Sequence, residues 1–146
     1  MRRIAVAAAA LALAVAGCGS SSPSMSRLRR QATRICQQAL DQSDRIMPPA
    51  LPSDTAAFLR QGTDVLGAEL VDLQALRAPA DDADSYSAAL TAASRQLSLL
   101  RGTIHDLDGG DDPVSEIKTL QRRLAPREST EDAAWRTLDI PACISR

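Results

Sequence analysis

Apolar residues recur at alternating spacings of three and four along most of the chain, which is the period of amphipathic helices. The first such stretch predicts a helix over 26–46 that ends before Pro48 and Pro49. The second begins after Pro52 and ends at Pro79. Both predicted helices therefore have prolines at their boundaries, and the connection between them is short.

The third stretch has the most regular repeat, with apolar residues at Tyr86, Leu90, Ala93, Leu97, Leu100, Ile104 and Leu107. This spacing is typical of the buried seam of a helix in a bundle. A fourth helix is predicted to begin at Asp112-Pro113, because Asp is a good N-cap and Pro is favourable at the first helical position. Pro126 removes a backbone donor, so we expect this last helix to be kinked there, or broken with a restart at Ser129. Short connections between amphipathic helices predict an all-α fold, an antiparallel four-helix bundle.

The N-terminus has the features of a bacterial lipoprotein signal. Two arginines precede an apolar run, and the small residues Ala16 and Gly17 lead directly to Cys18. The sequence thus predicts a signal peptide over 1–17 and acylation of Cys18. The alternative is an ordinary secretory peptide in which Cys18 is incidental.

The expected domain organisation depends on this signal. Residues 18–25 form the lipidated cysteine and a flexible Gly/Ser tether, and 26–146 form the bundle domain. We expect the protein on the extracytoplasmic face of the cell membrane, held there by its lipid. Four arginines beside the tether are candidates for contact with anionic headgroups, with a solvated helix face as the alternative. They are Arg27, Arg29, Arg30 and Arg34.

Two cysteines remain once Cys18 is assigned to the lipid. Cys36 and Cys143 lie near the two ends of the predicted bundle, in an oxidising compartment, and we expect them to form a disulfide. Two free thiols and a metal site are the alternatives. A tetrahedral metal site lacks ligands, because the chain has one His and no Cys-x-x-Cys motif.

Composition argues against nucleic acid as a partner. The chain has 17 basic and 18 acidic residues, and loss of the signal peptide removes two arginines, so the mature protein is the more acidic. Aromatic residues make up 2% of the chain, which leaves no platform for stacking bases. We expect no nucleic-acid binding.

The chemistry-bearing residues do not form a recognisable catalytic or metal motif. His105 is the only His, and a position on the helix surface is its simplest interpretation. The acidic run over 106–112 departs from a calcium loop, because Asp111 and Ile117 stand where such a loop needs Gly and Glu. A turn between helices explains it better than weak Ca²⁺ binding does. The sequence therefore predicts no catalytic residue, no metal site and no cofactor.

Three glycines fall inside predicted helices, where each costs about 1 kcal/mol relative to Ala. They are Gly62, Gly67 and Gly102. We expect close helix contacts to explain them, with a ligand cleft as the alternative.

Spaced motifs along the mature chain resemble a group of small secreted or lipid-anchored helical proteins of actinobacteria, whose function is uncharacterised. The motifs are Ala32-x-x-Ile35-Cys36-x-x-Ala39, Leu73-x-x-Leu76-x-x-Pro79, Tyr86-x-x-x-Leu90 and Leu138-x-Ile140-x-x-Cys143. The resemblance implies the bundle and the cysteine pair, and no activity. This chain departs from the pattern in having Asp139 where the closing motif has Gly, and Pro126 within the last helix.

Together these features predict a membrane-anchored envelope lipoprotein that is not an enzyme and acts as an interaction or structural module with another envelope protein. One alternative is a bundle that binds a small apolar ligand between its helices, which a cavity of a few hundred Å³ would support. A second is a small all-helical secreted enzyme. That alternative needs buried Arg and Glu, which the apolar seams do not predict.

Overall fold

The structure is a computed structural model and describes residues 23–144; the predicted signal peptide and Cys18 lie outside this range. The main helices are α1 (Met25–Ser43), α2 (Thr55–Gln74), α3 (Ala83–Asp108) and α4 (Pro113–Thr137). Short 3-10 turns, η1 (Pro52–Asp54), η2 (Ala80–Asp82) and η3 (Pro141–Cys143), lie between or after them. No strand occurs within 23–144, so the predicted all-α fold with four helices is confirmed.

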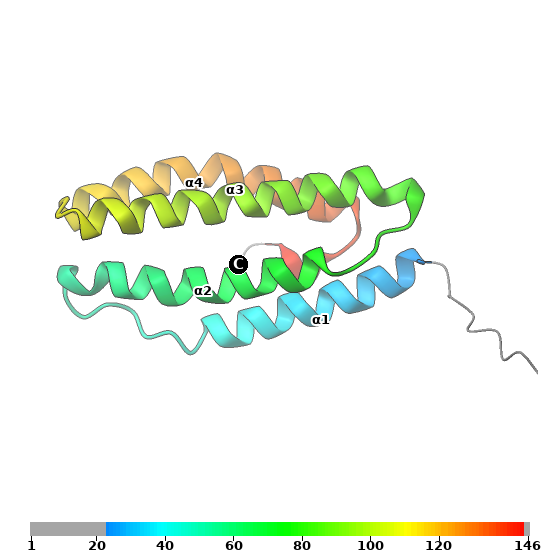
Figure 1. The fold of residues 1–146 in the computed structure, drawn as a ribbon, viewed down its shortest axis with the longest axis horizontal. Helices are drawn as coiled ribbons and strands as arrows, with labels where there is room; N and C mark the ends of the chain where they lie inside the picture. The colour runs from blue at the N-terminus through cyan, green and yellow to red at the C-terminus, as the bar shows by residue number, and fades with distance from the viewer. Residues whose placement is uncertain (1–22, 145–146) are drawn as a thin grey trace, which may run out of the picture.

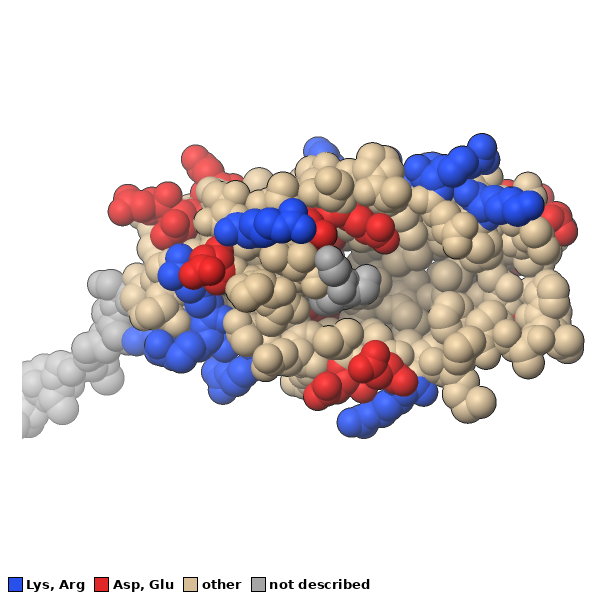
Figure 2. Space-filling view, turned by 180° about the vertical axis from the view of Figure 1, so that it is seen from behind, with Lys and Arg blue, Asp and Glu red and all other residues tan. Residues whose placement is uncertain are grey.

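The helices form two layers, with α1 and α2 in one and α3 and α4 in the other (Figure 1). Within each layer the two helices are antiparallel. Packing runs from α1 to α2, from α2 to α3 and from α3 to α4. On the fourth side, η3 packs on both α1 and α4 and fills one half of the space between them. The other half, farther from the start of α1, is hollowed at the surface (Figure 2).

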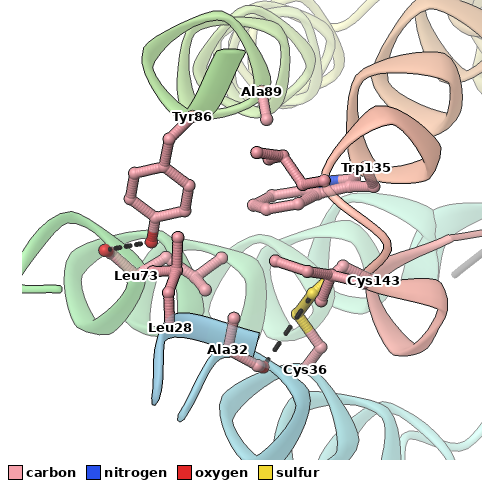
Figure 3. Close-up of a cluster of buried hydrophobic side chains, with 10 residues drawn as sticks. Leu28, Ala32, Cys36, Leu73, Tyr86, Ala89, Trp135 and Cys143 are labelled. Atoms are coloured by element: carbon pink, nitrogen blue, oxygen red, sulfur yellow. Dashed lines mark hydrogen bonds between the residues drawn. A yellow bond between two sulfur atoms is a disulfide. The ribbon is translucent and has the colours of Figure 1, made fainter. Parts of the chain in front are cut away.

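The main core lies in the half of the bundle that contains η3. Its largest side chain, Trp135, is completely buried and meets Tyr86 edge to face, with ring centroids 6.1 Å apart (Figure 3). The Tyr86 hydroxyl donates a hydrogen bond to the carbonyl oxygen of Leu73 near the end of α2, at 2.6 Å. Other buried members of this core are Leu28, Ala32, Cys36, Ala89, Leu138, Ile140 and Cys143.

The predicted disulfide is confirmed: Cys36 and Cys143 are bonded, with Cα atoms 5.2 Å apart and a sequence separation of 107. A Schellman turn leads into it, because the N–H groups of Asp139 and Ile140 donate to carbonyls of the last turn of α4. Asp139 takes φ 56°, a left-handed conformation that glycine adopts most easily. Arg29 supports the turn by donating to the carbonyl of Leu138 at 2.9 Å.

The acidic run between α3 and α4 is a helix-to-helix turn, as predicted. Gly110 adopts φ 100° after the last turn of α3, again in a Schellman arrangement of hydrogen bonds. The Asp112 carboxylate accepts from the backbone N–H of Ser115 at 2.8 Å, which caps α4. Asp108 pairs with Arg60 of α2. These local roles explain two of the four acidic residues of the run, Asp108 and Asp112.

The fourth helix continues through Pro126 as one element, so the break and the restart at Ser129 are not found. Pro126 and Arg122, whose carbonyl loses its intrahelical partner, are both exposed. Water can therefore satisfy that carbonyl at little cost. Thr130 adds a hydrogen bond from its hydroxyl to the Pro126 carbonyl, at 2.9 Å.

The apolar seam predicted for the third helix includes only some of the residues that are buried on α3. Tyr86, Leu97 and Ile104 are buried as expected, whereas the other seam residues are partly exposed. Ala89 and Leu99, outside the predicted seam, are buried as well. The difference arises because α3 packs on two neighbours, α2 and α4, and so presents a wider buried arc than a single seam.

Candidate functional site

The residues singled out for catalysis and metal binding do not converge. His105 is exposed on the last turn of α3. Within the described part of the chain, the one group with metal-ligand spacing is Cys36, Glu69 and Cys143, whose ligand atoms lie within 4.8 Å of one another. The two cysteines are joined in a disulfide and offer no thiolate. This group is therefore structural.

The four arginines predicted to contact the membrane lie in the first half of α1, which is the end of the bundle that follows the predicted tether. Arg30 and Arg34 are exposed, whereas Arg29 is partly buried by its contacts with Leu138 and Asp139. None of the helices described over 23–144 is long and apolar enough to cross a membrane.

An apolar cavity of about 380 Å³ lies between the helices, and we call it the interhelical cavity. A larger but shallower depression, of about 610 Å³, is lined by Arg29, Arg30, Thr33 and Arg34 of α1. The interhelical cavity lies in the half of the bundle that η3 does not fill and opens at the hollow seen in Figure 2. All four helices contribute to its wall. Its large apolar lining residues are Leu40, Ile46, Phe58, Leu59, Leu66, Leu100 and Leu124.

A glycine of α2 enlarges this cavity. A Cβ atom built on Gly62 meets nothing within 4 Å, and Gly62 lines the cavity wall. The predicted close helix contact is therefore wrong at Gly62, where the space belongs to the cavity. It is also wrong at Gly102, which is exposed with nothing within 4 Å. At Gly67 a Cβ would lie 3.5 Å from the Arg101 guanidinium, which is an ordinary contact distance, so close packing does not require glycine there either.

The cavity wall also carries polar groups, and two of them are buried on α2. Thr63 is 6% exposed and Glu69 is 4% exposed. The Thr63 hydroxyl is buried with no hydrogen-bond partner, which is uncommon for a Thr in a helix, since such hydroxyls usually bond to the preceding turn. The remaining polar lining residues are Ser43, Gln96 and Glu128.

A second, much smaller void of about 30 Å³ adjoins the inner end of the cavity, and Glu69 and Gln96 line both. Glu131 of α4 lines this void too and accepts a hydrogen bond from the indole N–H of Trp135 at 3.0 Å. Burial raises the pKa of Glu131 above its ordinary value, the Trp135 bond acts in the opposite direction, and the charges of Asp132 and Glu128 add to the rise. The void is large enough for one or two waters.

The burial of these two glutamates corrects the expectation that Glu residues fall off the apolar seams. A usable signal was present in α2, since Glu69 lies three residues after Leu66 and four before Leu73. That spacing places the carboxylate on the same face as the leucines. Composition alone could not reveal that Glu69 is buried, because Glu on a helix is usually solvated.

No family model, curated protein or solved structure matches this chain. Any assignment of function must therefore rest on the geometry of the interhelical cavity and the residues that line it.

Proposed function

We propose that this chain is a lipid-anchored envelope protein whose bundle binds an elongated, lipid-like small molecule in the interhelical cavity, without transforming it. The observation that carries the proposal is the cavity of about 380 Å³, lined by leucines, Ile46 and Phe58. Its size and mostly apolar lining with a few polar groups are typical of small-molecule sites. We therefore place ligand binding ahead of a purely structural role.

The size of the cavity favours a small molecule over a protein segment. Two turns of a helix with side chains, ~10 Å across and ~11 Å long, need about 850 Å³. That is more than twice the cavity volume. A single extended hydrocarbon chain is a better match, because Phe58 and Glu69, at opposite ends of the α2 wall, are separated by about 16 Å along the helix.

The position of the cavity suits a tethered binding protein. The tether is expected to join the bundle at the start of α1, beside the arginines, while the cavity begins near Ala39 in the later part of that helix. Ala39 is about 21 Å from Met25 along α1. The cavity therefore lies toward the end of the bundle away from the proposed anchor. The loop after α1 contributes Pro48 to the cavity wall, and its apolar residues Met47 and Leu51 are exposed, at 82% and 61%.

Filling the cavity tests this proposal. Gly62→Leu adds a side chain where nothing lies within 4 Å and also replaces a poor helix former, so the variant stays folded. We expect it to abolish binding of the apolar fluorescent dye phenylnaphthylamine, which the unaltered protein binds. The matched control is Gly102→Leu, which makes the same replacement at an exposed position outside the cavity and leaves dye binding unchanged.

Two results would overturn the proposal. One is dye binding that Gly62→Leu does not reduce, and the other is a protein that binds no dye. Native mass spectrometry of protein purified from its own cells should show a bound molecule that is recovered with unchanged mass after incubation. A modified molecule would instead support the enzyme alternative.

The anchor is tested separately. Cys18→Ser should release the protein from membranes and end its labelling by a fatty-acid analogue. The same variant checks whether the protein's own lipid occupies the cavity. If only the Cys18→Ser form binds the dye, the acyl chain on Cys18 is the occupant and an external ligand is excluded.

A further inference from the structure

The polar groups of the interhelical cavity indicate what the ligand's polar end must be. Those that line it are hydroxyls, an amide and carboxylates, from Ser43, Thr63, Glu69, Gln96 and Glu128. No Lys, Arg or His is among the described residues that line the cavity. The wall therefore offers many hydrogen-bond acceptors and no cationic partner.

Thr63 supplies the observation that points to a ligand at this position. Its hydroxyl is buried in the cavity wall, and no protein atom bonds to it. Leaving such a group unsatisfied is costly, whereas a ligand hydroxyl or amine in the cavity would satisfy it. Thr63 lies about 9 Å along α2 from Glu69, so both lie within the reach of one elongated ligand.

Glu69 and Glu128 determine the charge that the cavity tolerates. Glu69 is buried in the wall and Glu128 is exposed on α4, so acidic groups occur at two depths. A carboxylate has about four acceptor sites, so it can accept a ligand's N–H or O–H in addition to its contacts within the protein. A ligand carboxylate or phosphate would instead find no cationic partner in the wall and would meet the charge of Glu128 at its exposed part.

We infer that the interhelical cavity selects amphiphiles whose polar group bonds to Thr63 and carries no negative charge. This inference rests on the proposed function and adds its ligand class. Long-chain alcohols and amines belong to the class, and fatty acids do not.

The test compares three probes with the same chain, dodecanol, dodecylamine and dodecanoate, as competitors of phenylnaphthylamine at neutral pH below their micelle concentrations. We expect the alcohol and the amine to bind at least about fivefold more tightly than dodecanoate, which is the effect of one net hydrogen bond. Thr63→Val has the same shape without the hydroxyl, and it should lower affinity for dodecanol relative to the dye by about fivefold.

The outcomes separate this inference from the proposed function. If the dye binds but dodecanoate competes as well as dodecanol, the ligand class is wrong and the cavity assignment stands. If neither the dye nor any probe binds, the proposed function fails. Amine binding that persists in Gly62→Leu is adsorption to an acidic surface and would overturn the inference.

Discussion

Breaking the bond between Cys36 and Cys143 should destabilise the bundle strongly without unfolding it at low temperature. The bond closes a loop with a sequence separation of 107, and in the chain-entropy model such a loop contributes about 4.8 kcal/mol to the free energy of unfolding. A domain of about 120 residues has an unfolding entropy of about 250 cal/mol/K, so this loss corresponds to a Tm decrease of about 20 °C. Helical circular dichroism should persist when the reduced protein is cold, because the core around Trp135 remains packed.

The assay compares thermal melting of oxidised and reduced protein, with intact mass to count thiols. Both cysteines are buried, so native protein should resist a reducing agent until urea opens the fold, and reduction rates should rise steeply with urea. For a domain of this size, 1 kcal/mol changes Tm by about 4 °C. If reduction lowers Tm by less than about 5 °C, the entropic argument is refuted. Free thiols in freshly purified, non-reduced protein would refute the bond itself.

Three further predictions concern single side chains. Tyr86→Phe should cost about 1 kcal/mol, since the Leu73 carbonyl loses one of its two donors, as measured by urea unfolding. Asp139→Gly should raise the free energy of unfolding by up to about 1 kcal/mol, because glycine adopts φ 56° without strain. Glu131 has a raised pKa in the folded state, so it lowers stability as pH rises above its ordinary value of 4.5. Glu131→Gln should therefore gain stability relative to the unaltered protein between pH 4 and pH 7.

Each of these has a contrary result. A neutral Tyr86→Phe would mean that the buried hydroxyl bond contributes nothing net. A destabilised Asp139→Gly would mean that the ion pair with Arg29, 3.4 Å long and exposed, outweighs the backbone strain. A constant difference between Glu131→Gln and the unaltered protein across this pH range would exclude a raised pKa at Glu131.

The helices and the disulfide could be predicted because each rests on local or pairwise rules. Apolar periodicity and prolines indicated four helices, and Asp112 was a recognisable cap. Of the two expectations at Pro126, a kink or a break, the break was wrong, because the helix continues through the proline. Its exposed position, which lets water replace the missing backbone hydrogen bond, depends on the tertiary structure.

The cavity could not be predicted from periodicity, because it depends on how much of the space between α1 and α4 is filled by η3. A four-helix pattern implies that all four sides of the bundle are closed by helix contacts. Here η3 closes only one half of the side between α1 and α4, where the bond to Cys36 holds it. Where η3 does not reach, the leucines of the seams line a cavity and are partly exposed, as at Leu59 and Leu66.

The unusual residues of this cavity are the buried polar ones, Thr63 and Glu69, which lie on the apolar face of α2. Valine at Thr63 would pack a simple bundle better, because a buried hydroxyl without a hydrogen bond costs free energy. Burying the Glu69 carboxyl group also has a desolvation cost, whatever its partners in the protein. Gly62 likewise lowers helix stability by about 1 kcal/mol relative to Ala, with no close neighbour that would exclude a side chain. Gly62, Thr63 and Glu69 each lower the stability of the empty bundle, and all three line the same cavity. A ligand that packs against this wall would explain all three. Binding would then restore the packing and the hydrogen bond that the empty bundle lacks, and the ligand should raise Tm as its concentration increases.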